Sequence, residues 1–247
     1  MIKTFKRHVK SFVMRGGICS VPGERTFLFR HLETFAKELK NKRILDVGAG
    51  LRQYRYLFDE KNIYESCDLN GGFHQKKEHN IVANIYDITV ESHSYDVILL
   101  LQVLEHLEFP VKALKEVNRI LKDDGILFLS APQAAGDHFE PQHYFNYTQY
   151  GLKSVLGQAG FEILKHHRLD GMFVYIGNRI GKLGTILYDQ YKWNSHLLQK
   201  LLAMPFFGLC WILGAVIPIL DPLDKLRNYC IGHIVIAQKR KDAYACG

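Results

Sequence analysis

The sequence predicts an α/β fold built on a mostly parallel, doubly wound sheet, and three observations lead to this prediction. Short apolar runs alternate with amphipathic stretches over most of the chain. The first run ends in a glycine turn, VGAG, at residues 47–50. The 247 residues are 47% hydrophobic and 23% charged, a composition typical of globular proteins. Strands that alternate with helices form a parallel sheet with both faces covered.

The expected elements follow one another along the chain. Strands are expected at residues 42–47, 63–69, near 81, 95–101, 126–132, 161–168 and 232–240, and helices at 53–59, 109–121 and 148–159. The helix at 109–121 has apolar residues at three- and four-residue steps, which indicates one buried face. Thr148 is a typical N-cap, and Gly160 is typical of the position after a helix. The KDDG sequence at 122–125 predicts a turn, and the last two strands predict an antiparallel pair at the sheet edge.

Charge and cysteine content limit the classes of function. The formal net charge of +7 at pH 7 favours contact with anionic lipid, nucleic acid or an acidic substrate. The 5 cysteines are far apart and form no CxxC pair, which indicates a reducing compartment with neither a disulfide framework nor a zinc site. The N-terminal residues lack the uninterrupted apolar run of a secretory signal peptide. We therefore expect a cytoplasmic location.

A nucleotide-binding pattern is indicated by ILDVGAG at residues 44–50 and by an acid further along the chain. Gly48 and Gly50 let the backbone turn sharply and approach a ligand at the carboxyl end of the first strand. A glycine turn of this kind also occurs without a ligand. Asp68 ends the second strand about 20 residues later, where doubly wound folds place an acid that binds a ribose diol. Together these features favour a nucleotide-containing cofactor.

Six segments between residues 42 and 168 stand in a recognisable order. They are ILDVGAG followed by YRYLF, CDLN, NIYD, SYDVILLLQVLEHLEFP, LKEVNRILKDDGILFLSAP and HFEPQHYFNYTQYGLKSVLGQAGFE. This order resembles the class I S-adenosylmethionine-dependent methyltransferases, in particular the small bacterial methyltransferase-type-11-like enzymes often associated with cell-surface glycan biosynthesis. The resemblance implies a Rossmann-like, doubly wound seven-stranded sheet that is mostly parallel and has an antiparallel last strand.

The resemblance also implies that the chain binds S-adenosyl-L-methionine. Asp46, Gly48 and Gly50 would form the loop around the methionine part of the cofactor. Asp68 would accept hydrogen bonds from both ribose hydroxyls, and Leu69 would pack on the adenine.

Further cofactor contacts are implied after the third and fourth strands. Asp87 would meet the adenine amino group, and Gln102 and Val103 would line the methionine side. One position departs from the family pattern, because many members have a third glycine where this chain has Arg52. A related subgroup also lacks this glycine, so we still expect cofactor binding.

Two histidines are candidates for a catalytic base, which methyl transfer needs only when the acceptor is a hydroxyl or a protonated amine. His106 follows the fourth strand, and His143 follows the fifth. His106 could instead anchor its loop, and His143 could instead be a packing residue. Tyr144 and Tyr147 lie beside His143 and are expected to contact the substrate.

A metal site is not expected. Some quinone O-methyltransferases resemble this stretch and bind a divalent cation through two glutamates and a histidine. Glu105 and His106 match two of these ligands, but Gln102 stands where the first glutamate would be. Losing one carboxylate weakens a site for a hard cation.

The segment Leu201–Leu220 has twenty residues without a charge, enough to cross a bilayer by length. It lies between the last two expected strands, which must be on the same side of any membrane, so a single crossing is disfavoured. Its two prolines and two glycines break or bend helices. We expect an apolar helical insertion at residues 169–228 that touches the membrane surface; a helical subdomain or a dimer interface is the alternative.

The expected organisation has three parts: an N-terminal helical region at 1–40, a catalytic domain at 41–168 plus 229–240, and the insertion at 169–228. Within the first part, residues 2–13 place apolar side chains on one helix face and basic ones on the other, which is typical of helices lying on anionic lipid. A helix that merely covers the cofactor is the alternative.

These observations predict a methyltransferase that O-methylates a lipid-linked saccharide or another lipid at the inner face of the cytoplasmic membrane. A quinone or isoprenoid phenol is the second candidate acceptor. A nucleic-acid methyltransferase is disfavoured because the insertion is apolar rather than basic, and a non-catalytic cofactor-binding protein is also disfavoured. Nothing in the sequence indicates an oligomeric state.

Overall fold

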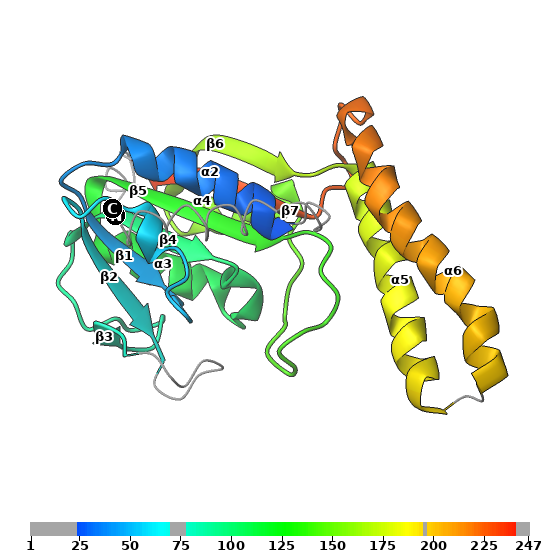
Figure 1. Ribbon diagram of the computed structural model, residues 1–247. Helices are drawn as coiled ribbons and strands as arrows, with labels where there is room; N and C mark the ends of the chain where they lie inside the picture. The colour runs from blue at the N-terminus through cyan, green and yellow to red at the C-terminus, as the bar shows by residue number, and fades with distance from the viewer. Residues whose placement is uncertain (1–23, 70–77, 195–196, 241–247) are drawn as a thin grey trace. The chain divides into compact units, whose positions relative to one another are not determined.

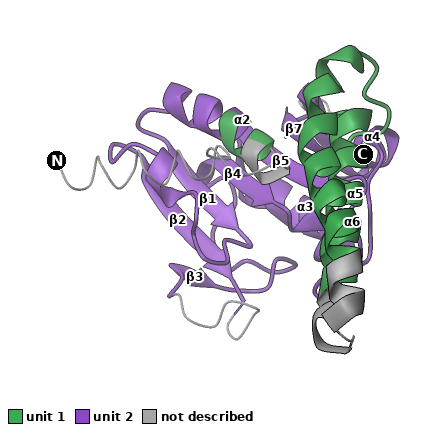
Figure 2. Ribbon diagram, turned by 45° about the vertical axis from the view of Figure 1, so that its right-hand side comes forward, with its two compact units in different colours: residues 1–30, 168–231 green, residues 31–167, 232–247 purple. Residues whose placement is uncertain are grey.

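The computed structural model describes residues 24–69, 78–194 and 197–240. The helix expected at residues 2–13 lies outside this part of the chain. The chain divides into two compact units, residues 31–167 with 232–247 and residues 1–30 with 168–231 (Figure 2). Helix α2 (Glu24–Glu38) lies across this division.

The sheet has seven strands in the order β3-β2-β1-β4-β5-β7-β6 (Figure 1). The strands are β1 (Arg43–Val47), β2 (Ile63–Asp68), β3 (Ile81–Val82), β4 (Tyr95–Leu101), β5 (Leu121–Pro132), β6 (Phe161–Leu169) and β7 (Gly232–Lys239). The pairs β1–β2, β1–β4, β2–β3 and β4–β5 are parallel, and β5–β7 is antiparallel. The predicted fold class, a doubly wound sheet with an antiparallel last strand, is therefore confirmed.

Helices cover both faces of this sheet. Ile98 and Leu100 of β4 belong to a core that also contains apolar residues of α3 (Pro110–Ile120) and α4 (Gln149–Gln158). On the other face, Phe35 of α2 stacks against Phe128 of β5 with ring centroids 4.9 Å apart. Burying each large apolar side chain contributes roughly 1.5–3 kcal/mol, so these contacts fix the strands that carry the site.

The third predicted helix begins where its capping residue indicates. The Thr148 side chain accepts a hydrogen bond from Gly151 N at 3.0 Å, which is the usual N-cap contact. Gly160 follows α4 with a φ of +81°, in the left-handed region that favours glycine.

Two predicted elements differ in the structure. The helix expected at 53–59 is only the 3₁₀ turn η1 (Arg55–Leu57), because Arg52 has a φ of +54° and Phe58 is extended. The turn expected at 122–125 lies inside β5 as an irregularity of the ladder: Tyr95 pairs with Leu121, whereas Val97 pairs with Ile126.

The unit of residues 168–231 is a helical hairpin with a short continuation. It contains α5 (Met172–Asn194), α6 (Leu197–Val216) and the 3₁₀ segment η3 (Ile217–Leu223). The apolar segment predicted as an insertion forms most of α6 and the start of η3, immediately before the last strand. Pro205 lies inside α6, so the predicted break at this proline does not occur; the helix ends before Pro218 instead.

Candidate active site

The loop after β1 closes tightly against the end of β4. Gly48 and Gly50 have φ values of +69° and +48°. A Cβ atom on Gly48 would lie 2.5 Å from Val103 Cγ2, so only glycine fits here. Gly48 N donates a hydrogen bond to Cys67 O at 2.9 Å, which joins the loop to the end of β2. The structure thus brings together residues that the sequence predicted to surround the methionine part of the cofactor.

The acid after β2 holds the same loop. Asp68 Oδ2 accepts a hydrogen bond from Gly50 N at 2.7 Å, and its Oδ1 accepts one from Leu69 N at 2.7 Å. Both carboxylate oxygens are therefore fixed in direction, and each keeps a lone pair for a ligand. Leu69 is exposed next to them. This carboxylate fits the predicted role of a ribose acceptor.

Asp46, at the end of β1, is almost completely buried. The pKa of this carboxyl is raised to about 7: burial has the largest effect and raises it, the hydrogen bond from Tyr64 lowers it, and the charges of Asp68 and Arg52 respectively raise and lower it. The Tyr64 hydroxyl donates that bond to Asp46 Oδ2. Sequence reasoning missed Tyr64. A tyrosine within a predicted buried strand was the available signal, because its hydroxyl needs a partner.

Arg52 occupies the position where many family members have glycine. Its φ of +54° lies in the left-handed region, which explains why glycine is common there. The side chain extends across the loop, where Nη1 donates a hydrogen bond to Glu78 O at 3.2 Å. Its charge acts on the buried carboxyl of Asp46. The departure from the family pattern therefore adds a cation to this loop and leaves the backbone turn intact.

Asp87 lies on the segment between β3 and β4. It forms an isolated antiparallel bridge with Asn84, and Asp87 N donates a hydrogen bond to Asn84 O at 3.0 Å. Its side chain is exposed. Its contact with adenine stays a prediction.

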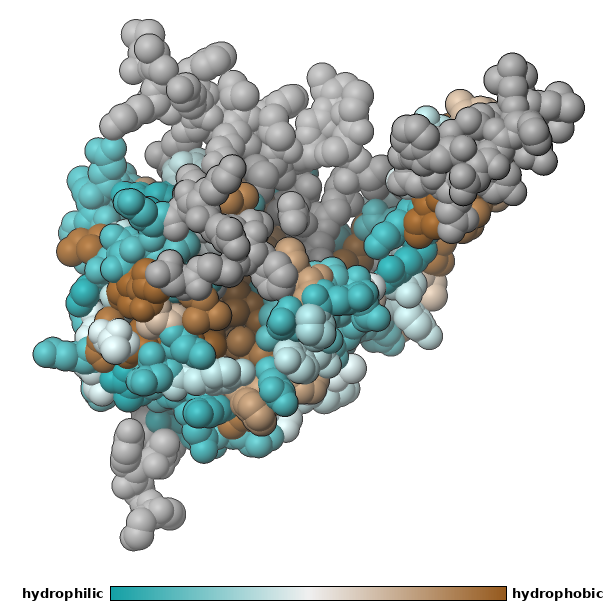
Figure 3. All heavy atoms as spheres, turned by 90° about the horizontal axis from the view of Figure 1, so that it is seen from below, coloured by the Kyte–Doolittle hydropathy of each residue, from teal (hydrophilic) through white to brown (hydrophobic). Residues whose placement is uncertain are grey.

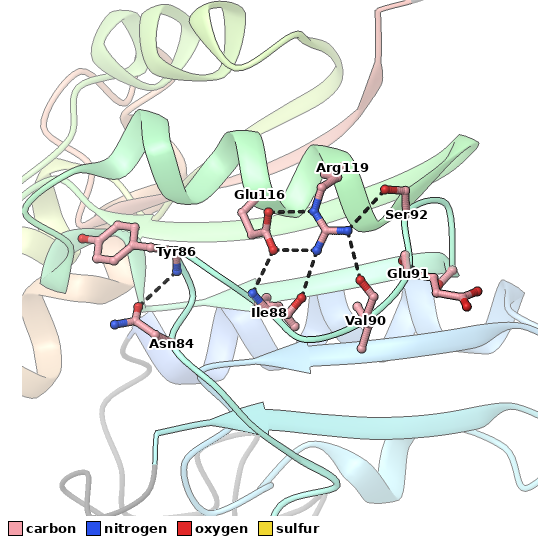
Figure 4. Close-up of polar contacts among 9 residues, drawn as sticks. Asn84, Tyr86, Ile88, Val90, Glu91, Ser92, Glu116 and Arg119 are labelled. Carbon is pink, nitrogen blue, oxygen red and sulfur yellow. Dashed lines mark hydrogen bonds and ion pairs between the residues drawn. The ribbon is translucent and has the colours of Figure 1, made fainter.

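Two side chains of α3 hold the segment that follows Asp87 (Figure 4). Glu116 Oε1 accepts from Ile88 N at 2.8 Å, and Arg119 Nη2 donates to Ile88 O at 2.9 Å. Arg119 Nη1 reaches Val90 O at 3.0 Å and Ser92 Oγ at 3.2 Å. The two side chains also pair with each other, so the hydrogen bonds of Arg119 lower the pKa of Glu116. Sequence reasoning missed this clamp because its partners are far apart in the chain.

Gln102, just after β4, has a φ of +56° and turns toward β5. Its backbone N donates to Ser130 O at 3.0 Å, and its side-chain Nε2 donates to Ser130 Oγ at 3.2 Å. Ser130 is completely buried. The amide of Gln102 is therefore held by the sheet, beside Val103, which touches the glycine loop.

Beyond this point lie Glu105, His106, His138 and His143, here called the histidine cluster. Glu105 and His106 belong to the 3₁₀ turn η2 (Leu104–His106), and the other two histidines come from the loop after β5. Tyr144 N donates a hydrogen bond to Glu105 O at 2.9 Å, which joins the two segments. The ring centroid of His106 lies 4.9 Å from the ring centroid of His138 and 5.9 Å from that of His143.

His106 is held in one tautomer. Its Nδ1 lies 2.6 Å from Gln142 O, and because a carbonyl oxygen only accepts, Nδ1 carries the proton. Burial lowers the pKa of His106, the bond to Gln142 opposes this, and the charges of His138 and His143 lower it further. The imidazole is therefore favoured in its neutral form with a lone pair on Nε2, as a base requires.

The remaining predicted residues differ in exposure. The His143 side chain is only 4% exposed; its Nδ1 lies 3.5 Å from Asp137 Oδ1, and among the described residues neither ring nitrogen finds a hydrogen bond. Tyr144 is exposed and open to a substrate. Tyr147 is buried, and its hydroxyl donates to Leu104 O at 3.2 Å, so it packs under the turn that carries His106.

One face of the molecule, seen from below, has apolar residues next to polar ones. Figure 3 shows hydrophobic residues in a hollow that is bordered by hydrophilic ones.

The chain matches a family model described as a methyltransferase domain over residues 23–166, which is more than half of its length. An uncharacterized protein of Methanocaldococcus jannaschii is 35% identical over 107 residues, which is 41% of this chain. The match spans 47% of that relative, so about half of its length is represented here.

Solved structures share the fold. An S-adenosylmethionine-dependent methyltransferase of Archaeoglobus fulgidus has a TM-score of 0.54 at 16% identity, covering 96% of this chain and 97% of that chain. The [4+2]-cyclase SpnF has a TM-score of 0.55 at 16% identity, covering 96% of each chain. Phosphoethanolamine N-methyltransferase 2 of Haemonchus contortus, solved with S-adenosylhomocysteine, has a TM-score of 0.52 at 15% identity, covering 94% of this chain and 57% of that chain.

Likeness at such identities shows a common fold but not a common substrate. The family model covers the glycine loop after β1, the acid after β2 and most of the sheet. The chain therefore belongs to the methyltransferase domain family.

Proposed function

We propose that this enzyme O-methylates an acceptor presented at the inner face of the cytoplasmic membrane, such as a lipid-linked saccharide or another lipid. The observation that carries the proposal is the helical hairpin α5–α6, which has an apolar exterior and a tightly packed interior. The glycan part rests on the family resemblance, and the membrane part rests on the hairpin.

We propose the same cofactor-binding roles that the sequence implied. Asp46, Gly48 and Gly50 surround the methionine part, beside Gln102 and Val103. Asp68 binds the ribose hydroxyls, with Leu69 and Asp87 at the adenine. When bound, S-adenosylmethionine supplies a methyl group activated by a sulfonium, so the residues of the chain chiefly hold the reacting atoms close and in line.

A histidine would take the proton of an acceptor hydroxyl. His106 Nε2 and His143 are the two candidates, and both belong to the histidine cluster, after the carboxyl ends of β4 and β5. Proton transfer to a positioned imidazole contributes about 10²–10⁴-fold to a rate. Full turnover in both His106→Ala and His143→Ala would show that no histidine base is needed.

The hairpin is packed through small residues. A Cβ atom on Gly184 would lie 2.7 Å from Cys210 Cβ, and one on Gly177 would lie 2.7 Å from Pro218 Cγ. A Cβ atom on Gly214 would lie 3.0 Å from Gly177 O. The two helices therefore approach closely at these glycines, as small residues allow in membranes.

Large apolar side chains lie on the outside of the same hairpin. Within the stretch Ala203–Leu223, only 22% of an 18-residue apolar window is buried. Its exposed apolar residues include Met204, Phe206, Leu209, Trp211, Ile212, Leu213, Val216, Ile219 and Leu220. Contiguous exposed apolar surface of this kind marks a contact site. Because glycine fills the inside and large side chains face outward, we propose lipid as the contact.

The topology fits membrane contact in which the chain does not cross the bilayer once between β6 and β7. The hairpin leaves the sheet after β6 and returns at β7, and these strands are neighbours in one sheet. A chain that crossed the bilayer once between them would separate the two strands. The hairpin is therefore proposed to enter the surface from one side, where the net charge of +7 favours anionic lipid.

Flotation with lipid vesicles tests the membrane part. The full chain should float with vesicles of phosphatidylethanolamine and phosphatidylglycerol, and Ile212→Ser with Ile219→Ser should weaken this at least tenfold. The matched control is Leu164→Ser with Tyr150→Ser, two exposed apolar residues of the α/β unit. A detergent-free soluble monomer that never floats would refute membrane contact, and a soluble dimer that the serine pair converts to monomer would show an interface instead.

Two measurements test the catalytic part. Calorimetry with S-adenosylhomocysteine should show binding that Asp68→Ala weakens at least a hundredfold, because Asp68 also orders the glycine loop. Mass spectrometry of lipid extracts from cells with and without the gene should show one methylated species that depends on the gene. A methylated quinone or isoprenoid phenol would favour the second candidate acceptor, which the apolar hairpin also suits. A methylated nucleic acid without any lipid change would refute both.

A further inference from the structure

The geometry of the histidine cluster points to a second function of this chain: we propose that Glu105, His106 and His138 bind one divalent transition-metal ion. One possible ligand atom from each residue lies within 4.8 Å of the others. Two ligands of one ion with bonds of about 2.1 Å lie at most about 4.2 Å apart, so small side-chain rotations suffice.

Both histidines already have the tautomer that such a site needs. His106 Nδ1 lies 2.6 Å from Gln142 O, and His138 Nδ1 lies 2.9 Å from Gly136 O. A carbonyl oxygen cannot donate, so each Nδ1 carries a proton, and in the neutral imidazole the lone pair is then on Nε2. Metal-binding histidines almost always donate their other ring N–H to a carboxylate, a backbone carbonyl or a water, which fixes the ring in this way.

Glu105 supplies the negative charge. Its side chain is completely buried, and its Oε1 lies 3.9 Å from His106 Nε2. A carboxylate removed from water is stabilised by positive charge close to it, which a cation between these atoms would provide. The backbone of Glu105 is fixed by the loop that carries His138, through the bond from Tyr144 N.

His143 is an independent sign that a ligand belongs here. Its side chain is 4% exposed, and within the described part of the chain its two nitrogens make no hydrogen bond. Its ring centroid lies 4.3 Å from that of His138. A buried imidazole without a hydrogen bond is costly, and a water or an acceptor oxygen on the proposed ion would supply the partner.

The ligand set selects the class of metal. Two imidazoles and one carboxylate suit Zn²⁺, Co²⁺ or Fe²⁺, whereas Mg²⁺ and Ca²⁺ prefer oxygen ligands alone. The set differs from the two glutamates and one histidine considered from the sequence, because the Gln102 side chain bonds to Ser130 instead. Three protein ligands leave a position for an acceptor oxygen. With His106 on the metal, His143 is the remaining proton acceptor.

Titration of the untagged, EDTA-treated full chain with Zn²⁺ alone tests this proposal, and the visible absorption of bound Co²⁺ gives a second readout. We expect one tight ion per chain and an affinity at least tenfold lower in His138→Ala and in Glu105→Gln. The control is His93→Ala, which removes another histidine beside a carboxylate, 3.0 Å from Asp123, outside the cluster.

The outcomes are distinguishable from those of the proposed function, because the titration contains neither cofactor nor acceptor. Unchanged Zn²⁺ affinity in folded His138→Ala, or an equal loss in His93→Ala, would overturn the proposal while leaving methyl transfer untouched. Circular dichroism and thermal unfolding show whether each variant is folded. If Glu105→Gln fails that check, His138→Ala decides alone, since its loop position leaves the sheet intact.

Discussion

The hydroxyl of Tyr64 donates a hydrogen bond to the carboxylate of Asp46, which joins β2 to β1 just before the glycine loop. Asp46 is buried and its pKa is raised to about 7, so the state of this pair changes near neutral pH. An unfolded chain would lose the same proton near pH 4. The site therefore holds a charge that the fold itself opposes.

This pair predicts a pH dependence of stability. Between about pH 4 and pH 7 the folded chain keeps a proton that the unfolded chain has lost, so the free energy of unfolding falls as pH rises and the full cost is present above pH 7. The upper bound is about 4 kcal/mol. Asp46→Asn should therefore stabilise the chain at pH 8 and have little effect at pH 4, as measured by thermal unfolding. The same gain at both pH values would contradict this cause.

Tyr64→Phe tests the same pair from the other side. The hydrogen bond from Tyr64 lowers the pKa of Asp46, so its loss should raise that pKa above about 7. The fall of stability with rising pH should then extend to higher pH. Carbon-13 NMR of the Asp46 carboxyl measures the pKa directly, and an unchanged or lower value would show that the bond does not set it.

Gly48→Ala should abolish tight cofactor binding. The new methyl group would lie 2.5 Å from Val103 Cγ2, and the φ of +69° is strained for alanine. We expect at least a tenfold loss of affinity for S-adenosylhomocysteine in calorimetry. Adding Val103→Ala should restore part of it by removing the clash, while the φ strain stays.

A matched alanine substitution separates the clash from a general effect of removing glycine. In Gly208→Ala the new methyl group would meet nothing within 4 Å, so affinity should not change. Failure of Val103→Ala to rescue any binding would place the whole cost in the backbone of Gly48.

Asp221→Ala should loosen the start of the hairpin. Asp221 Oδ1 accepts from Gly171 N at 3.0 Å and from Val174 N at 3.1 Å, so it caps the first turn of α5 from fifty residues away. Losing a cap costs about 0.5–2 kcal/mol. Hydrogen exchange of the first amides of α5 should rise roughly 2- to 30-fold. Asp59→Ala, which removes one exposed turn contact with Lys61 N, is the control and should leave those amides unchanged.

Much of the sheet could be predicted because buried strands leave a local signal. The apolar run at Tyr95–Leu101 and the Thr148 cap each lie within a few residues of the element they define. The length of the helix expected at 53–59 was overestimated, because only the turn η1 forms there. An arginine gives no sequence signal that its backbone is left-handed, as that of Arg52 is. The glycines of the loop and Asp68 were predicted as cofactor-binding residues because they stand at a known spacing, and this role stays a prediction.

What escaped prediction depends on contacts between distant positions. Asp221 accepts a hydrogen bond from Gly171, which is 50 residues away in the chain. The close packing inside the hairpin depends on the approach of Gly184 to Cys210, which the sequence alone does not show. The sequence of α6 is largely apolar, so it does not show which of its side chains face outward. His138 joined the histidine cluster through the bond from Tyr144 N to Glu105 O, which no spacing rule indicates.

The clamp of Glu116 and Arg119 should act on the cofactor through Asp87. Arg119 contacts three residues of the segment through Ile88 O, Val90 O and Ser92 Oγ, and Glu116 holds Ile88 N. Arg119→Ala should free this segment and cost about 1–3 kcal/mol, a 5- to 150-fold loss of affinity for S-adenosylhomocysteine. Hydrogen exchange at Ile88 N should rise in parallel.

The conservative variant decides whether geometry or charge matters in this clamp. Arg119→Lys keeps the charge but cannot form the forked contacts, so it should lose nearly as much affinity as Arg119→Ala. Full recovery with lysine would show that charge alone suffices. If the segment loosened while affinity for both S-adenosylhomocysteine and adenosine stayed constant, Asp87 would have no part in holding the adenine, and its predicted contact would be refuted.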